Sequence, residues 1–231
     1  MNKLNANLSL GECVIIYPAI VERFNEMNLD YCCGGSQKLE EALLEKGVNV
    51  EKFIEEINEE FEKFKFNNKE YVDWNEKTSE DLIYHIINTH HAATFQLLKE
   101  IDPLLLKIFK VHFHHMPETL IKVHKLFGQL KAELEEHLIK EEKILFPAMI
   151  EFENSKDEVK KEELAKEIKS FIDEHEAAGD ILKELAEITD DYRIPEWACT
   201  TFKLVYLKMH DLEKDLFIHI HKENNILFKR F

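Results

Sequence analysis

A stretch of ten residues occurs twice in this chain of 231 residues, first as His137–Phe146 and later as His219–Phe228. The copies read HLIKEEKILF and HIHKENNILF, and they share six residues: His, Lys, Glu, Ile, Leu and Phe. Two residues four apart on an α-helix project from the same face, so each copy aims one imidazole and one carboxylate in a single direction. The repeat therefore predicts that two helices each carry half of one metal site.

The composition indicates a protein made almost wholly of helices, because only six glycines and five prolines occur in a chain rich in Leu, Ile, Glu and Lys. Pro103 predicts a separate short helix before residue 116, and Pro147 predicts a kink or a stop. Short helices are expected over residues 18–27, 36–46 and 50–65, and long amphipathic helices over about 79–100, 117–152, 157–189 and 196–225.

Local signals mark several helix ends. Pro18 favours a helix start, Gly47 favours a helix end, and Asn49 and Thr78 are typical N-caps. A polar stretch that ends at Thr78 separates the short helices from the long ones.

Two domains are therefore expected. Residues 1–68 would form a small helical domain that contains the turn Cys-Cys-Gly-Gly, and residues 78–231 would form a four-helix bundle.

The charge balance excludes some partners. With 46 acidic and 30 basic residues, the formal charge is −16, so neither nucleic acid nor an anionic membrane surface is expected to bind. No charged and then apolar leader opens the chain, and no apolar run reaches the ~20 residues of a membrane span. Four cysteines, two of them adjacent at Cys32 and Cys33, do not form a secreted disulfide framework. A cytoplasmic location is expected.

Six residues are candidate metal ligands because they fall on the apolar stripes of the long helices. His91 and His137 are 46 residues apart, and His175 and His219 are 44 apart, which suggests two similar helical hairpins. Periodicity favours His91 over its neighbour His90 but does not reject His90. The candidate ligands are His91, His137, Glu141, His175, His219 and Glu223.

The ligand types point to iron, manganese or zinc. A single histidine on an apolar stripe is most often a hydrogen-bonded core residue, but two matching His and Glu pairs with two further histidines favour a metal site. Burying two ionised glutamates without partners would cost several kcal/mol each, which a metal centre offsets. Ferritin-like sites use Glu-x-x-His and more carboxylates, whereas this histidine-rich set favours a haemerythrin-like pair of irons bridged by the two glutamates.

The motifs resemble those of a known family. The turn Asp30-Tyr-Cys-Cys-Gly-Gly35, followed by H-x3-E-E-x-I-L-F-P and H-x3-E-N-N-x-L-F, is similar to the RIC family, haemerythrin-like di-iron proteins that repair iron-sulfur clusters. The resemblance covers essentially the whole chain and includes the segment Pro195–Thr201. One departure is Lys229, which stands where the family often has proline.

The resemblance implies an all-α fold, with a haemerythrin-like four-helix bundle preceded by a small helical N-terminal domain. It also implies two non-haem iron ions with oxo and carboxylate bridges, and it selects His91 rather than His90 as a ligand. Members of the family are cytoplasmic, often dimeric, and act on iron-sulfur proteins damaged by oxidants or nitric oxide. Iron donation to the damaged cluster is the expected activity.

The roles of the cysteines stay open. Cys32 and Cys33 could act as thiols that receive iron or bind nitric oxide, because thiols before a helix N-terminus ionise more readily. Alternatively they pack a tight turn in which Gly34 and Gly35 supply unusual dihedral angles. Cys13 and Cys199 are expected to be packed thiols. The remaining histidines are expected to be surface or core residues.

Three other functions compete with repair. The same centre could carry dioxygen reversibly, it could reduce nitric oxide enzymatically, or the bundle could be purely structural. The Cys32 and Cys33 segment favours repair, because an oxygen carrier has no need of it.

Overall fold

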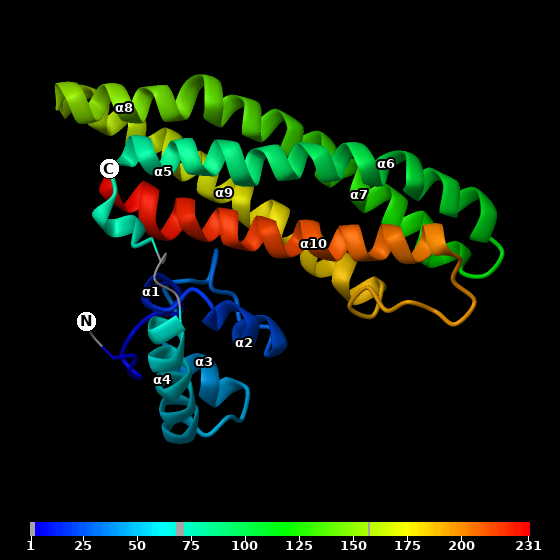
Figure 1. Ribbon diagram of the computed structural model, residues 1–231. Coiled ribbons are helices and arrows are strands. Elements are labelled where there is room, and N and C mark those ends of the chain that lie inside the picture. Colours follow the sequence, from blue (N-terminus) through cyan, green and yellow to red (C-terminus); the bar gives the residue numbers. More distant parts are fainter. Residues whose placement is uncertain (1–2, 68–71, 157) are drawn as a thin grey trace. The chain divides into compact units, whose positions relative to one another are not determined.

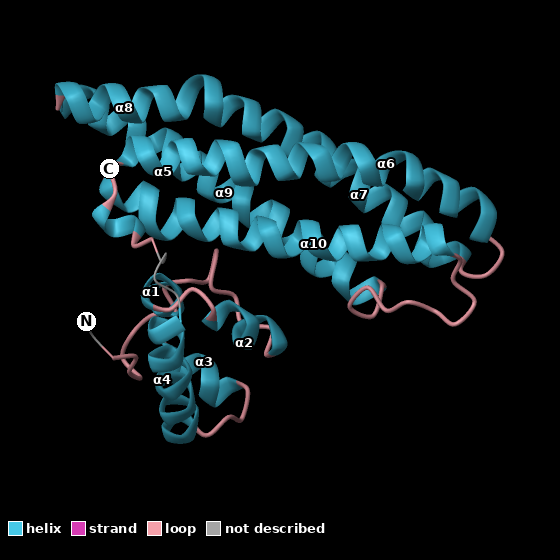
Figure 2. Cartoon of the chain, viewed as in Figure 1, coloured by secondary structure: helices cyan, strands magenta, loops and turns pink. Residues whose placement is uncertain are grey.

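The computed structural model describes residues 3–67, 72–156 and 158–231 (Figures 1 and 2). Within these ranges the regular structure is helical, and the pairing of Ser9 with Lys38 is an isolated bridge. The expected all-α fold is confirmed. Among the described residues, no helix is both long and apolar enough to cross a membrane.

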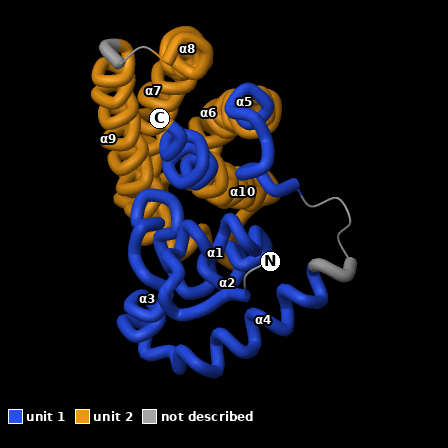
Figure 3. Tube along the Cα trace, turned by 90° about the vertical axis from the view of Figure 1, so that its left-hand side faces the viewer, with its two compact units in different colours: residues 1–82, 220–230 blue, residues 83–219, 231 orange. Residues whose placement is uncertain are grey.

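The chain divides into two compact units (Figure 3). One unit comprises residues 1–82 and 220–230, and the other comprises residues 83–219 with Phe231. Residues 68–71, which belong to the expected boundary, lie outside the described residues. The division into domains 1–68 and 78–231 stays a prediction.

The first unit begins with a cluster of helices that the sequence indicates only in part. The expected short helices are present as α2, α3 and α4, and α1 is an addition. The start of α1 is fixed by a capping box, in which the Glu12 N–H donates to Ser9 Oγ and the Ser9 N–H donates to the Glu12 carboxylate. The helices are α1 (Leu10–Ile16), α2 (Ile20–Glu26), α3 (Leu39–Glu45) and α4 (Val50–Asn67).

The expected caps of these helices form. Gly47 follows α3 with a φ of +69°, a left-handed conformation that favours glycine. Asn49 caps α4, since its Oδ1 accepts the N–H of Lys52 at 2.9 Å. Thr78 caps the helix that follows, since its Oγ1 accepts the N–H of Asp81 at 3.0 Å.

Four helical rods follow the short 3-10 turn η1 (Trp74–Glu76). The first two rods are α5 (Ser79–Ile86), η2 (Ile87–His91) and α6 (Ala92–His112), then α7 (Pro117–Lys140), η3 (Glu141–Leu145) and α8 (Phe146–Ser155). The last two are α9 (Glu158–Ile188), then α10 (Thr200–Lys222), η4 (Glu223–Leu227) and η5 (Phe228–Arg230). In the second unit α6, α7, α9 and α10 lie side by side as a bundle (Figure 1).

The expectation of a separate helix after Pro103 is wrong. Helix α6 runs through Pro103 to His112, although proline removes one backbone hydrogen bond from a helix interior. The fully buried Ile101 and Leu105 stand on either side of it, so packing of the apolar face offsets the missing hydrogen bond. Pro147 does not stop the second rod either, because it lies in the first turn of α8, directly after the π-helical segment η3.

Apolar side chains from the four helices fill the core of the bundle. They are buried almost completely, and they sit at the three- and four-residue spacing that the sequence shows. Members of the core include Leu98, Leu105, Leu120, Phe127, Leu134, Leu182, Phe202, Met209 and Leu216.

One carboxyl group is buried at the edge of this core. Burial, reinforced by the charge of Asp191, raises the pKa of Glu213 from an ordinary 4.5 to about 7. Between these values the folded protein holds a proton that the unfolded chain releases, so this group lowers stability as the pH rises through that window. Glu213→Gln is therefore expected to stabilise the metal-free protein by on the order of 2 kcal/mol at pH 8 and to have little effect near pH 4.

Urea unfolding at the two pH values measures this effect. Glu184→Gln, which removes the same charge from an exposed position on α9, serves as the matched control. An equal gain from both variants, or a gain for Glu213→Gln that does not depend on pH, would contradict the assignment.

Candidate metal centre

Three segments of π-helix interrupt the long rods, and each contains a candidate ligand. His91 ends η2, Glu141 begins η3 and Glu223 begins η4. The last two stand at the same position of the ten-residue repeat, so the repeated sequence has a repeated structure. A π-helical turn holds an additional residue and often occurs at functional sites. The wider turn therefore places these side chains where a regular α-helix would not.

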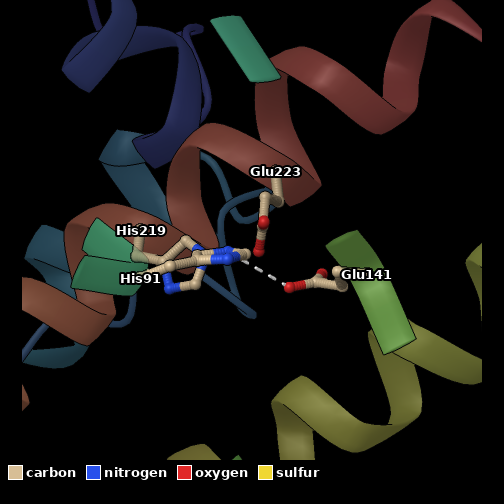
Figure 4. A group of neighbouring side chains, drawn as sticks. All are labelled: His91, Glu141, His219 and Glu223. Atoms are coloured by element: carbon tan, nitrogen blue, oxygen red, sulfur yellow. Dashed lines mark hydrogen bonds and ion pairs between the residues drawn. The ribbon is translucent and has the colours of Figure 1, made fainter. Parts of the chain in front are cut away.

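A first group of four candidate ligands converges in the interior (Figure 4). His91, Glu141, His219 and Glu223 each offer an atom within 4.8 Å of the others. All four are at most 1% exposed. The two imidazoles face each other, with 3.2 Å between the Nε2 atoms of His91 and His219. Glu223 follows His219 by four residues on the same rod, as the spacing of the repeat predicts.

A second group contains His137, Glu141 and His175. The Nε2 atoms of His137 and His175 are 3.0 Å apart, which repeats the arrangement of the first imidazole pair. The buried side chains of this group come from α7, η3 and α9.

Glu141 belongs to both groups and faces them with different oxygens. Its Oε2 lies 3.4 Å from Nε2 of His91. Its Oε1 lies 3.4 Å from Nε2 of His137 and 3.8 Å from Nε2 of His175. One carboxylate thus stands between two pairs of imidazoles and belongs to both groups of atoms that could hold a cation.

Carboxylates outside the centre fix the orientation of two imidazoles. Nδ1 of His91 lies 3.0 Å from Oε1 of Glu142, and Nδ1 of His137 lies 2.8 Å from Oε2 of Glu174. An ionised carboxylate only accepts hydrogen bonds, so each Nδ1 carries the proton and each Nε2 turns a lone pair inward.

The inward-facing atoms fit a metal ion. The neutral imidazoles turn lone pairs toward each other and toward Glu141 at short distances, and such atoms repel one another unless a cation stands among them. Imidazole nitrogen and carboxylate oxygen together suit iron, zinc and manganese. Glu142 and Glu174 are not among the residues that the sequence predicts for the site. Each stands next to a candidate ligand in the chain, and that adjacency is the only signal of its role.

The structure separates the two neighbouring histidines of the first rod. His90 is also buried, but its Nδ1 lies 2.9 Å from Oδ1 of Asp215 and its ring stacks on His219 with 5.6 Å between the ring centroids. It is not in either group of converging atoms. Apolar periodicity does not decide between His90 and His91. In the structure it is His91 that lies close to the other candidate ligands.

The Cys-Cys-Gly-Gly turn forms a separate, compact arrangement in the first unit. Oδ1 of Asp30 accepts the N–H groups of Cys33 and Gly34 at 3.0 and 2.9 Å, and the Cys32 thiol lies 3.2 Å from it. The two sulfurs are 3.9 Å apart. Asp30, Cys32 and Cys33 therefore form another group of atoms close enough to hold a cation.

Two expectations for this turn are wrong. No helix begins directly after the cysteines, and the hydrogen bond with Cys33 together with burial raises the pKa of Cys32 well above its usual value. Neither Gly34 nor Gly35 has a positive φ. These glycines are required by close approach instead, because a Cβ on Gly35 would come within 2.7 Å of the backbone oxygen of Tyr31.

The end of the fourth rod holds the turn in place. Nδ2 of Asn225 donates to the carbonyl oxygen of Cys32 at 3.0 Å, and Nδ1 of His221 lies 3.3 Å from the carbonyl oxygen of Tyr31. In the first copy of the repeat, the corresponding positions are the exposed Ile139 and Lys143. The two copies therefore differ where the second one contacts the Cys-Cys-Gly-Gly turn.

Comparison with known families agrees with this arrangement. The Hemerythrin HHE cation binding domain matches residues 82–231. A second family, described as Domain of Unknown function (DUF542) and named ScdA_N, matches residues 6–60.

Curated relatives match along nearly the whole chain. The iron-sulfur cluster repair protein ScdA of Staphylococcus haemolyticus is 31% identical over 223 residues, which cover 96% of each chain. The iron-sulfur cluster repair protein YtfE of Pectobacterium atrosepticum is 35% identical over 225 residues, or 96% of this chain and 95% of the relative. A probable iron-sulfur cluster repair protein of Haemophilus influenzae is 33% identical over 225 residues, or 97% of this chain and 96% of the relative.

Proposed function

The chain belongs to the family of iron-sulfur cluster repair proteins with a haemerythrin-like cation-binding domain, and on this premise we propose that it supplies iron to iron-sulfur clusters damaged by oxidants or nitric oxide. The proposed clients are the damaged iron-sulfur proteins themselves. The proposed cofactor is a pair of non-haem iron ions, held by His91, His137, Glu141, His175, His219 and Glu223.

The position of Glu141 carries this proposal. Its two oxygens face different imidazole pairs, and it belongs to both groups of converging atoms. That arrangement supports two cations with one shared carboxylate rather than a single ion. The excess of imidazole over carboxylate supports iron over calcium or magnesium, which prefer oxygen ligands.

The residues of the centre bind and orient the ions in a site closed to bulk water, since all six candidate ligands are at most 5% exposed. Glu142 and Glu174 hold the rings of His91 and His137 and keep Nε2 unprotonated. Iron, when bound, can change its oxidation state, which changes how strongly nitrogen and carboxylate ligands hold it.

Cys32 and Cys33 are proposed as thiol ligands that take part in passing iron to a client. Their sulfurs are 3.9 Å apart, close to the separation expected for two thiolates on one tetrahedral metal ion with bonds of about 2.3 Å. Because the pKa of Cys32 is raised, its proton is expected to leave only when a metal ion arrives.

Transfer of iron can be tested directly. Protein loaded with ferrous iron under anaerobic conditions is mixed with an iron-sulfur dehydratase that peroxide has inactivated, in the presence of a ferrous chelator. We expect the dehydratase to recover activity faster than with an equal amount of free ferrous iron. The double variant Cys32→Ser and Cys33→Ser is expected to keep its iron and to transfer it more slowly.

Recovery no better than that with free iron would reject iron donation. Titration of the ferrous protein with dioxygen then tests whether the protein is an oxygen carrier. A carrier would give an oxygenated spectrum that is stable and that reverses when dioxygen is removed. Sustained turnover of nitric oxide to nitrous oxide would instead assign a reductase.

A further inference from the structure

A second reactive site lies at the far end of the bundle from the metal centre. His112 is the last residue of α6, 21 residues after His91, and is therefore about 30 Å away along the helix. Its Nε2 lies 3.1 Å from the sulfur of Cys199. We propose that Cys199 and His112 form a nucleophilic thiol and imidazole pair that exchanges with small disulfides.

The distance between the two atoms favours a proton-sharing pair over a metal site. Imidazole nitrogen and thiolate bound to one tetrahedral zinc ion, with bonds of about 2.0 and 2.3 Å, would be about 3.5 Å apart. The observed 3.1 Å is shorter, and it fits a direct hydrogen bond between nitrogen and sulfur. His112 is thus placed to accept the thiol proton.

The backbone also supports negative charge on the sulfur. Cys199 directly precedes α10, and its sulfur lies 3.5 Å from the N–H of Phe202, which donates to it. This is the position of an N-cap, where the first N–H groups of a helix have no partner within the helix. The positive end of the dipole of the 23-residue α10 therefore faces the sulfur.

His112 is held firmly against the thiol. It is 7% exposed, and its ring packs against the rings of Trp197 and Phe202, with centroids 5.3 and 5.6 Å away. Its Nδ1 is buried and has no hydrogen-bond partner among the described residues. His91 and His137 differ, because a carboxylate holds each of their Nδ1 atoms. Among the described residues, the hydrogen bond of the His112 ring is thus made to Cys199.

Cys199 is also the most accessible of the four cysteines, all of which lie in the described part of the chain. It is exposed, so the expectation that it is a packed thiol is wrong. Cys13 and Cys32 are buried, and burial raises the pKa of Cys13 to about 12. Cys33 is only partly exposed. Cys199 is therefore the cysteine residue that a small disulfide approaches most easily.

The reaction is a thiol and disulfide exchange. The proton of Cys199 passes to Nε2 of His112, and the sulfur attacks one sulfur of the small disulfide. A new bond forms between Cys199 and that sulfur while the original disulfide bond breaks. The departing sulfur takes the electron pair and the proton from His112 and leaves as a thiol. The Cys199 sulfur is oxidised and the departing sulfur is reduced, with no further reactant.

The test uses the full-length, iron-loaded protein and 4,4′-dithiodipyridine, a small neutral disulfide. The released thiol gives the rate, and peptide mass mapping identifies the modified cysteine. A free thiol is only a few per cent ionised at neutral pH, so Cys199 is expected to react about tenfold faster than N-acetylcysteine. Cys199→Ser should remove this fast phase.

The role of His112 is tested by His112→Gln, which should slow the reaction of Cys199 about tenfold. The control is His115→Gln, because His115 is exposed and stacks on Trp197, whereas the imidazole that lies on the sulfur is that of His112. This variant should leave the rate within about twofold. If His112→Gln does not fold, the wild-type protein in denaturing urea replaces it, and the advantage of Cys199 over N-acetylcysteine should disappear there. The proposal is overturned if Cys199 in the folded protein reacts no faster than N-acetylcysteine. It is also overturned if neither the loss of His112 nor unfolding slows the reaction.

Discussion

Replacing Glu141 by glutamine is expected to abolish binding of the iron pair. The carboxylate oxygens of Glu141 face two imidazole pairs, whereas an amide offers one oxygen and no charge. The first group would keep the carboxylate of Glu223, but the second group, which contains His137 and His175, would lose its carboxylate. We expect the affinity to fall by more than about 100-fold, since loss of a partner outside the ligand set already costs 10- to 100-fold. Iron content after anaerobic reconstitution and desalting measures the loss.

Two control variants separate the bridge from general charge effects. Glu142→Gln keeps every candidate ligand and weakens only the hydrogen bond to His91, so a loss of about 10- to 100-fold is expected. Glu133→Gln changes an exposed residue of the same rod and should leave iron binding unchanged. A Glu141→Gln protein that keeps two iron ions per chain would contradict the proposed centre.

Replacing Gly35 by alanine is expected to give the largest loss of stability in the first unit. The added Cβ would lie 2.7 Å from the backbone oxygen of Tyr31 and 2.7 Å from Oδ1 of Asn225. The Tyr31 oxygen is a backbone atom and cannot rotate away as a side chain can. The turn must therefore move, which weakens the hydrogen bond between Asn225 and Cys32. Such overpacking costs about 3 kcal/mol.

Gly128→Ala is the matched control for Gly35→Ala. Gly128 lies inside α7, and a Cβ there would meet no atom within 4 Å. Alanine favours the helix, so this variant should gain about 0.5 to 1 kcal/mol. Urea unfolding of both metal-free variants, followed by a probe of each unit, checks the pair of results. Equal effects from the two substitutions would show that close approach at Gly35 is unimportant.

Much of the bundle could be predicted from the sequence because the relevant signals are local. The apolar spacing identifies the long helices, and Asn49 and Thr78 form the caps that their side-chain chemistry favours. The same spacing places His137 and Glu141 on the stripe that the structure buries. The charged ligands follow the apolar stripe because a metal centre inside a bundle must use inward-facing positions.

Other features could not be predicted because they depend on contacts distant in the chain. The continuation of α6 through Pro103 depends on packing of residues such as Ile101 against the rest of the core. The pairing of His91 with Glu142 and of His137 with Glu174 joins different helices. The need for glycine at residue 35 arises in the folded turn, where a Cβ would lie 2.7 Å both from the Tyr31 backbone oxygen and from Oδ1 of the distant Asn225. Local propensity carries no information about any of these.

The π-helical turns at Glu141 and Glu223 have a consequence for how the chain tolerates change in length. The wide turn takes up one extra residue, so the residues after it stay on the faces that they would occupy in a regular α-helix without that residue. Deleting a single residue of η4, such as Asn224, is therefore expected to restore α-helical winding and to leave Ile226 and Leu227 buried, while removing the wide turn in which Glu223 lies. The expected result is a more stable helix that has lost the local geometry of one candidate ligand.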